Sequence, residues 1–342
     1  MIFIPLGDPK SINIRAICHV LNGYHGSSSV ILVGSYEVWK DQTKLLNKIA
    51  VGQDFVQPPV LETVFNSVQQ IMNENILGRK FYFLNLDASM GEIPSFNGEE
   101  IPESFRGAVS VNALDSVEAV TKIFENNSSR FAVLTCPIDK KVASIAGFKF
   151  PGQTEFFESL WNGKSVMVLA GPNLQVGLVT NHESLENVSK LITVELICDK
   201  FQMFHSTLKS FHEKDHVKIA ICGLNPHLSD GGLFGDHEQR VIMPALERLR
   251  NMGFLVDLCP ADTAFYLNKI GSYDGVLAMY HDQGLGPLKT VDFDTAINIT
   301  GGLKHLRVSP DHGPASDKMF CSDISTNSFR SALNYCIKYI DG

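Results

Sequence analysis

The chain has 342 residues, of which 44% are hydrophobic and 19% are charged, so it can bury a sizeable core. At roughly 100–200 residues per domain, this length predicts about two domains. The formal net charge of -8 argues against a dedicated nucleic-acid binder, which usually presents a basic face.

Short apolar runs recur along the chain and predict buried β-strands. Each run has the length of a strand and is almost continuously apolar, as expected for strands that are buried on both faces of a sheet. The runs cover residues 2–6, 30–34, 81–84, 131–134, 166–169, 176–179, 219–222 and 276–279.

Helical patterns lie between several of these runs. Apolar residues at a spacing of about 3.6 predict amphipathic helices over residues 242–252 and 329–340. Residues 185–211 contain no Pro or Gly, so we expect one long helix there, which could also serve as a dimer surface. Residues 91–107 are polar and predict a surface loop. Strands that alternate with helices indicate an α/β fold with largely parallel sheets.

Several common sequence features are absent. No apolar run approaches the roughly 18 residues of a membrane span, and the opening residues lack the basic start of an export signal, so we expect a cytoplasmic protein without a membrane segment. The seven cysteines lie singly and form no CxxC pair, which favours buried thiols over disulfides or a thiolate zinc site. The chain has neither a P-loop nor the G-x-G-x-x-G pattern.

Three histidines, His182, His227 and His281, each follow a run that is predicted to be a strand. The carboxyl ends of strands frame the ligand crevice of open α/β sheets, so the three imidazoles can converge on one point. Three histidines with open positions beside them are a usual way to hold a catalytic divalent metal. Because their spacing matches no local metal motif, the alternative is that each is an ordinary hydrogen-bonded loop residue.

Further polar residues lie on or near the segment that follows the third histidine. Asp282 could orient that histidine or move a proton. Lys289, Asn298 and Arg307 together would suit a phosphate group, because Lys and Arg supply positive charge and the amide supplies a donor. The alternatives are that Lys289 and Arg307 are solvated charges and that Asp262 caps a helix.

These motifs together resemble those of the 4-hydroxythreonine-4-phosphate dehydrogenases of pyridoxal 5'-phosphate biosynthesis. The resemblance covers residues from about 130 to 315, and its motifs are specific in order and spacing. The segments that carry it are residues 152–157, 180–182, 223–227 with 231–232 and 235, 260–263, 279–285, 298–300 and 311–313.

The resemblance implies a fold like that of isocitrate and isopropylmalate dehydrogenases, with two α/β/α domains and an active site in the cleft that a homodimer completes. We therefore expect a first domain of residues 1–146 and 316–342. A second domain, residues 147–315, would carry the metal site, the substrate site and the dimer interface. These enzymes hold NAD outside a Rossmann domain, which agrees with the missing glycine pattern.

The same resemblance implies the chemistry of the site. One divalent metal, which could be zinc, magnesium or cobalt, would be bound by His182, His227 and His281. The substrate would be contacted by Gln153, Thr154, Lys289, Asn298 and Arg307, and protons would be moved or the substrate amine oriented by Asp262 or Asp282. The implied reaction is oxidation of the C3 hydroxyl of 4-phosphooxy-L-threonine by NAD or NADP, followed by loss of carbon dioxide to give 3-amino-2-oxopropyl phosphate.

The chain departs from the usual pattern of this family in three places. Residues 7–15 lack two of the family's glycines, Gln153 replaces a usual His, and residues 314–321 replace a Gly- and Ala-rich loop expected near the cofactor. Gln153 favours a first alternative, a paralogous dehydrogenase of another four-carbon 4-phosphate acid of the threonate or erythronate type. Residues 314–321 favour a second, a non-catalytic relative that binds a metal or ligand but no longer binds NAD.

Overall fold

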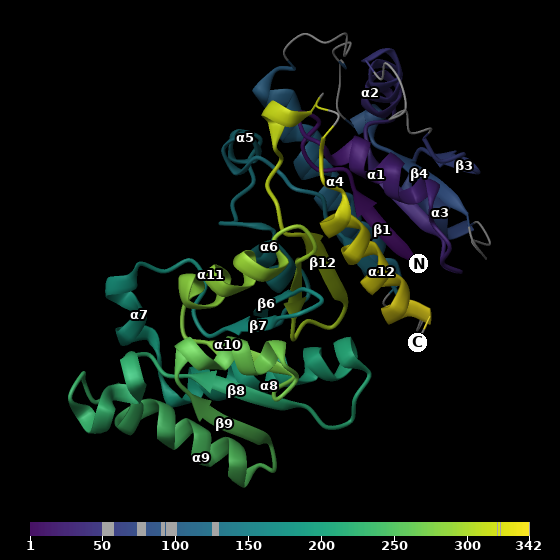
Figure 1. The fold of residues 1–342 in the computed structure, drawn as a ribbon. Coiled ribbons are helices and arrows are strands. Elements are labelled where there is room, and N and C mark those ends of the chain that lie inside the picture. Colours follow the sequence, from purple (N-terminus) through teal and green to yellow (C-terminus); the bar gives the residue numbers. More distant parts are fainter. Residues whose placement is uncertain are drawn as a thin grey trace. The chain divides into compact units, whose positions relative to one another are not determined.

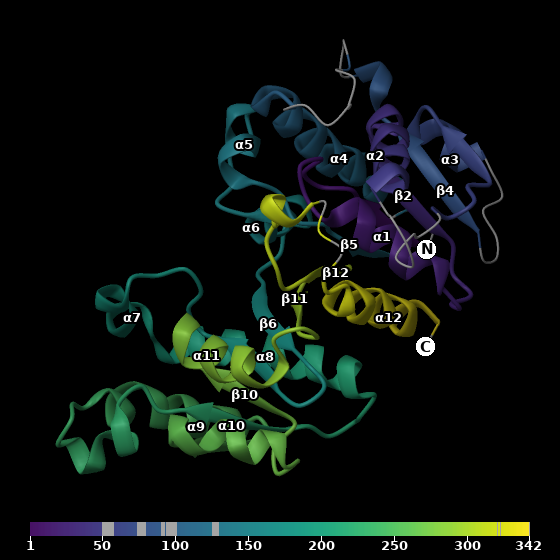
Figure 2. The ribbon, with the colours of Figure 1, turned by 45° about the horizontal axis from the view of Figure 1, so that its top comes forward.

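The computed structural model of the chain describes residues 1–49, 58–73, 80–89, 93, 101–124, 130–319, 321 and 323–341. It divides into two compact units, Met1–Trp161 with His305–Gly342 and Asn162–Lys304. The first unit is built from both ends of the chain, which lie side by side in Figure 1 and Figure 2. Near those ends, Ser28 Oγ donates a hydrogen bond to Asp341 Oδ1 at 3.0 Å.

The boundaries of the compact units differ from the predicted domain boundaries. Residues 147–161 and 305–315, which the prediction assigns to the second domain, fall within the first unit. One cause is the strand β12 (Leu306–Pro310), which pairs in parallel with β5 (Ala132–Leu134).

The first unit contains a parallel sheet with the order β3-β4-β2-β1-β5-β12. The central strands β1 and β2 are buried along their whole length, as expected for strands covered on both faces. The four remaining bounds are β1 (Ile2–Pro5), β2 (Val30–Gly34), β3 (Thr63–Phe65) and β4 (Phe81–Asn85).

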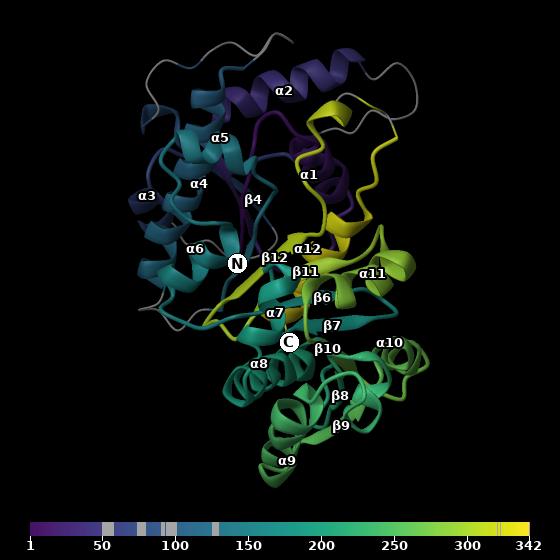
Figure 3. The ribbon, with the colours of Figure 1, turned by 90° about the vertical axis from the view of Figure 1, so that its left-hand side faces the viewer.

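Helices cover both faces of this sheet. Figure 3 shows α1 and α12 on one side and α4 on the other, which is the arrangement that right-handed crossovers produce when the strand order reverses. The helices are α1 (Asn13–Asn22), α2 (Tyr36–Ile49), α3 (Val68–Asn73), α4 (Glu103–Phe124), α5 (Lys140–Ile145), α6 (Gln153–Leu160) and α12 (Asn327–Asp341).

The second unit contains a mixed sheet with the order β11-β6-β7-β10-β8-β9. The pairs β11–β6 and β6–β7 are antiparallel, whereas β7, β10, β8 and β9 run parallel. The strands therefore pair largely in parallel, as predicted, except for the two antiparallel pairs that β6 forms. The strands are β6 (Val166–Ala170), β7 (Gln175–Leu178), β8 (Lys218–Cys222), β9 (Leu255–Cys259), β10 (Gly275–Ala278) and β11 (Ile297–Gly301).

Helices α8 and α9 lie on one side of the second sheet and α10 and α11 on the other (Figure 3). The hydrophobic core between the sheet and α10 and α11 is formed by residues such as Leu178, Phe265 and Leu288. The helices are α7 (Leu185–Leu191), α8 (Val194–His212), α9 (Met243–Asn251), α10 (Ala261–Lys269) and α11 (His281–Asp292).

The prediction of one helix over residues 185–211 is wrong. Helix α7 ends at Leu191 and α8 begins at Val194, because Thr193 adopts an extended conformation and its hydroxyl accepts a hydrogen bond from Leu196 N at 3.1 Å. A side-chain cap of this kind starts a new helix. The predicted loop over residues 91–107 is wrong for its last five residues, which belong to α4, while residues 91–92 and 94–100 lie outside the described part.

The expectations from composition fare better. Every predicted strand is present. All cysteines are buried except Cys321, which is partly exposed. Burial raises the pKa of the Cys18 thiol to about 12, so this group is inert near neutral pH. Among the helices of the described residues, none has the length and apolarity to cross a bilayer.

Candidate active site

Three neighbouring parallel strands of the second unit end at one edge of its sheet. These strands are β7, β10 and β8, and one of the three histidines follows each of them. His182 follows β7, His281 is the first residue of α11 after β10, and His227 lies in the turn after β8. The strand order therefore brings the three imidazole-bearing loops to the same edge.

His182 and His281 lie against each other, with ring centroids 5.6 Å apart. Both line a cavity of about 220 Å³, together with Asn181, Tyr280 and Asp282. His281 Nδ1 is 2.7 Å from Asp282 Oδ1, which leaves Nε2 as the ring atom for a further partner. A carboxylate at one ring nitrogen fixes the imidazole and makes its other nitrogen a better metal ligand.

His227 lies in a left-handed turn. Four successive residues that are not glycine, from His227 to Asp230, have φ values of 53°, 55°, 67° and 43°. The left-handed conformation costs about 1–2 kcal/mol for each L-residue, so other contacts must stabilise this turn. Strained backbone of this kind often accompanies functional sites.

Besides a bond from Asn225 Nδ2 to Ser229 Oγ at 3.4 Å, the side-chain contacts that hold the turn come from Glu238, which is 1% exposed. Its carboxylate accepts hydrogen bonds from Asn225 N at 2.7 Å, from Asn225 Nδ2 at 3.0 Å and from the Ser229 hydroxyl. Burial alone would raise the pKa of Glu238, but the hydrogen bonds from Ser229 and Asn225 outweigh it and lower the pKa. The residue is therefore ionised at neutral pH.

Gln283 links the loops that carry two of the histidines. Its Oε1 accepts a hydrogen bond from Met279 N at 2.7 Å, and its Nε2 donates to Gly223 O at 2.9 Å. Gly223 directly follows β8, and Met279 directly follows β10. The sequence assigns no role to Gln283, whose bond to Gly223 O joins residues 60 positions apart, nor to Glu238, which stands in a polar stretch that resembles exposed surface.

The described residues contain no group of three His, Cys, Asp or Glu side chains close enough to hold a metal ion. The structure thus brings His182 and His281 together, and His227 is held separately in its turn. The donor chemistry fits a divalent metal such as zinc or cobalt, since neutral imidazoles suit these ions and Asp282 orients one of them. The three-histidine site stays a prediction.

The other predicted residues of the second unit differ in their surroundings. Lys289 lies in α11 with its ammonium group 5.3 Å from the centre of the Phe293 ring. Asn298 lies in β11, and its Oδ1 is buried without a hydrogen-bond partner among the described residues. Asp262 lies in the first turn of α10, whose N-cap position is taken by Pro260, so the reading of Asp262 as the helix cap is wrong.

The predicted residues of the first unit are anchored to the end of β5. Arg307 is 4% exposed, and its Nε donates to Thr135 Oγ1 at 3.0 Å. Burial lowers the pKa of Arg307 to about 10, which still leaves it charged at neutral pH, so its reading as a solvated charge is wrong. Gln153 Nε2 donates to Cys136 O at 3.0 Å, while its Oε1 is buried and has no partner among the described residues. The neighbouring Thr154 is also buried.

The comparisons with known proteins agree with the resemblance seen in the sequence. The family model described as "Pyridoxal phosphate biosynthetic protein PdxA" matches residues 27–336. The chain belongs to this family. Its similarity to PdxA structures covers the whole α/β fold: it superposes on the 4-hydroxythreonine-4-phosphate dehydrogenase of Klebsiella pneumoniae with a TM-score of 0.78, at 28% identity over 99% of both chains.

Two relatives named 4-hydroxythreonine-4-phosphate dehydrogenase show how far the similarity extends in sequence. The chain is 40% identical to the Geobacter metallireducens protein over 218 residues, which are 63% of this chain and 63% of that protein. It is 35% identical to the protein of Sulfurihydrogenibium sp. over 318 residues, which are 92% of this chain and 90% of the relative. The first alignment thus spans less than two thirds of the Geobacter relative.

Two segments in which departures from the family pattern are expected from the sequence contact each other in the first unit. Ile12 N donates to Pro314 O at 3.1 Å, and the Ser316 hydroxyl donates to Lys10 O at 2.5 Å. Arg15 Nη1 also donates to Cys321 O. Three hydrogen bonds therefore join the segment of residues 10–15 to that of residues 314–321.

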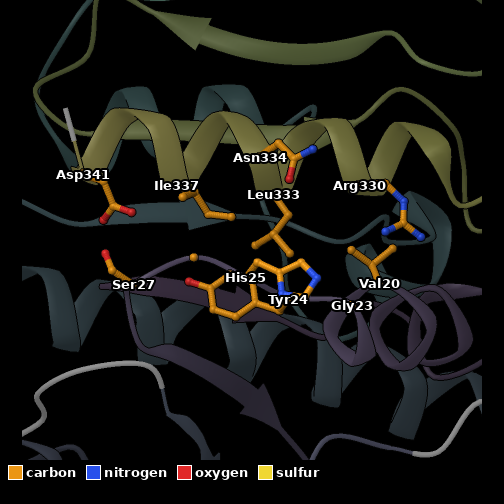
Figure 4. Close-up of a pocket in the computed structure, with 11 residues that line it drawn as sticks. Val20, Gly23, Tyr24, His25, Ser27, Arg330, Leu333, Asn334, Ile337 and Asp341 are labelled. Carbon is orange, nitrogen blue, oxygen red and sulfur yellow. The ribbon is translucent and has the colours of Figure 1, made fainter.

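A second hollow, which lies in the first unit, is lined by none of the candidate site residues. It has a volume of about 460 Å³ and lies between residues 23–27 and α12 (Figure 4). Arg330 lies near one end of it and Asp341 near the other. Its lining comes from helices and a loop, whereas Gln153 and Arg307 are anchored at the end of a strand.

Proposed function

We propose that this member of the PdxA family oxidises 4-phosphooxy-L-threonine at its C3 hydroxyl with NAD or NADP, in a metal-dependent reaction followed by decarboxylation to 3-amino-2-oxopropyl phosphate. The observation that carries the proposal is the pair of His182 and His281, with ring centroids 5.6 Å apart and Asp282 on one ring. Two relatives that bear the name of this dehydrogenase support it, one of them matched over 92% of the chain.

The metal ligands in this proposal are His182, His227 and His281. When bound, zinc, magnesium or cobalt supplies positive charge that favours loss of the hydroxyl proton and stabilises negative charge on the product. Asp282 holds the ring of His281 in place through the 2.7 Å contact. Asp262 is the second candidate for moving a proton, because it lies in the first turn of α10 with its carboxylate beside the Thr263 hydroxyl.

The substrate residues in this proposal divide by chemistry. Arg307 and Lys289 supply positive charge for the phosphate, whose binding energy positions the reacting carbon. Gln153 and Asn298 each present a buried oxygen that accepts no hydrogen bond within the described chain. Such acceptors suit a substrate that carries ammonium and hydroxyl donors, since an unpaired buried acceptor costs free energy. Thr154 completes this set of five.

The finer fold assignment is also part of the proposal. We assign the two units to α/β/α domains of the isocitrate and isopropylmalate dehydrogenase type, acting as a homodimer. The division into a unit with both chain ends and a unit of central residues supports this assignment. Sedimentation equilibrium of the full chain tests the dimer.

The test of the activity is reduction of NAD or NADP followed at 340 nm, with 4-phosphooxy-L-threonine and added zinc, magnesium or cobalt. We expect turnover that depends on the metal and disappears in His281→Ala. The control is His216→Ala, an exposed histidine beyond α8. Turnover in His281→Ala equal to that of the unchanged chain would refute the site assignment.

Gln153 supports a second candidate function, oxidation of a threonate or erythronate 4-phosphate. Its amide is fixed by the bond to Cys136 O, so it offers a neutral acceptor where the family usually has a titratable His. Parallel assays of the three phosphorylated acids separate the candidates by kcat/KM.

A third candidate is a relative that no longer binds NAD. The contact between residues 10–15 and 314–321 favours it, and titration with NAD and NADP tests it.

A further inference from the structure

We propose that Glu238 is a positioning residue for His227. The inference rests on the proposed function in one respect, because it takes His227 to be a metal ligand. The hydrogen bonds of the Glu238 carboxylate come from Asn225 and Ser229, neither of which is assigned to the metal or the substrate. It is the most deeply buried carboxylate at this edge of the second sheet among the described residues, at 1% exposure.

Glu238 accepts hydrogen bonds from residues on both sides of His227. Asn225, two residues before the histidine, donates two hydrogen bonds to the carboxylate, from its backbone nitrogen at 2.7 Å and from Nδ2 at 3.0 Å. Ser229, two residues after the histidine, donates a third from its hydroxyl. The position of His227 is therefore set by a carboxylate that lies outside the turn.

The turn needs these hydrogen bonds because its backbone conformation is unfavourable. His227, Leu228, Ser229 and Asp230 all have φ between 43° and 67°, a region that residues with a Cβ rarely adopt. The absence of a side chain at Gly223 makes room for this arrangement, since a Cβ there would lie 2.7 Å from Leu228 Cδ2 and 3.5 Å from Glu238 Oε1. Without the carboxylate, we expect the turn to relax toward ordinary backbone conformations.

The hydrogen bonds that hold the turn require a carboxylate at position 238. All three groups that reach Glu238 are donors, and an ionised carboxylate accepts hydrogen bonds at both oxygens. An amide of the same size accepts at one oxygen only and places an NH₂ group against a donor. Glu238→Gln is therefore a small change in volume that removes the function of the residue.

The first experiment measures hydrogen–deuterium exchange of residues 223–236 in the full-length chain. We expect exchange there to be at least several-fold faster in Glu238→Gln, with the rest of the second unit unchanged. The matched control is Glu247→Gln, the same substitution at an exposed position of α9. Unchanged exchange in Glu238→Gln would overturn the proposal whether or not the chain binds a metal.

The second experiment measures binding of Co²⁺ by its absorption spectrum. Residues that orient metal ligands typically contribute 10–100-fold to metal affinity, and we expect a loss of that size in Glu238→Gln. Faster exchange with unchanged Co²⁺ affinity would overturn the role toward His227. If the unchanged chain binds no Co²⁺, or binds it equally after His227→Ala, the proposed metal site fails and the positioning role fails with it, while the exchange data still report whether Glu238 holds the turn.

A suppressor distinguishes positioning from a general loss of stability. Asp230 is exposed and has φ 43°, so Asp230→Gly removes strain from the turn itself. We expect it to restore part of the Co²⁺ affinity of Glu238→Gln. The control is Asn162→Gly, which relieves a φ of 46° elsewhere in the unit. Equal recovery by both glycines would show a merely structural role and overturn the proposal.

Discussion

The two units hold polar groups beyond the ends of their strands in opposite ways. In the first unit, Asp8 after β1 is fully buried and forms a two-pronged ion pair with Arg106, at 2.9 Å and 2.5 Å. In the second unit, the side chain of His281 is 34% exposed, and its partner Asp282 is 91% exposed.

The buried pair of Asp8 and Arg106 has a structural role, whereas the more exposed His281 is available to bind a ligand. A buried charge is stable only with a permanent partner, so the pair of Asp8 and Arg106 fixes the loop after β1. An exposed imidazole can exchange water for a ligand at little cost, so His281 is suited to binding. In the second unit, the loops that carry the histidines are positioned by close backbone packing and by Glu238 instead. The following substitutions test this contrast, beginning with the largest expected effect.

Arg106→Met should break the buried ion pair of the first unit. It leaves the buried carboxylate of Asp8 without its charged partner and, within the described chain, with the hydrogen bond from Lys10 N alone, and the loss of such a partner typically costs about 3–5 kcal/mol of unfolding free energy. Urea denaturation measures the loss. Lys122→Ala, which removes an exposed ion pair with Glu118 on the same helix α4, should change stability by less than about 0.5 kcal/mol. The double variant Asp8→Asn, Arg106→Met should recover part of the loss, and no recovery would mean that the pair is not coupled.

Two glycines of α11 should respond in opposite directions. A Cβ on Gly284 would lie 2.7 Å from Val176 Cγ1, so Gly284→Ala should push α11 from β7 and cost about 1–3 kcal/mol. A Cβ on Gly286 would meet nothing within 4 Å, and Gly286→Ala should stabilise the helix by about 0.5–1 kcal/mol.

Thermal unfolding and activity of the two α11 variants give the comparison. Because α11 begins at His281, we expect Gly284→Ala to lower turnover as well as stability, and Gly286→Ala to leave turnover unchanged. Equal effects of the two substitutions would contradict the close packing of α11 on β7.

The strands that the sequence predicts and those that it does not differ in one respect. The predicted runs are almost continuously apolar, whereas three of the four described strands that are not predicted carry polar residues within them, and the fourth, β3, has only three residues. Asp257 interrupts β9, Asn298 interrupts β11 and Arg307 interrupts β12. Local hydrophobicity therefore predicts the strands that are apolar throughout and fails where a polar or ionisable residue stands inside a strand.

The candidate site divides in the same way. Histidines after strands are local features, so their place at one sheet edge follows from the sequence and the parallel order. Their supporting contacts are not local. Gln283 bonds to a residue 60 positions away, and Arg307 bonds to Thr135 across 172 positions. Pairings of this kind depend on which loops the fold brings together, and no pattern within a window of sequence reveals them.

Glu238 is one of the buried carboxylates of the second unit, like Asp292, and it predicts a dependence on pH. Its pKa is lower in the folded chain than in the unfolded chain, so its contribution to stability is complete above the ordinary pKa of a glutamate and is lost as the pH falls through the lowered value. The chain should therefore exceed Glu238→Gln in melting temperature at pH 7, and the difference should shrink below about pH 4.5. Glu247→Gln should show no such trend, and a constant difference for Glu238→Gln would contradict the hydrogen bonds.

The smallest expected effect concerns the helix boundary that separates α7 from α8. Thr193→Ala removes the hydroxyl that accepts from Leu196 N at 3.1 Å and should cost about 1 kcal/mol, the usual value of such a cap. Ser184→Ala, at the start of α7, should change stability by no more than about 0.3 kcal/mol because Ser184 makes no side-chain cap bond. Since neither residue belongs to the proposed site, turnover at 25 °C should stay unchanged in both, and a loss in Thr193→Ala would extend the site into α8.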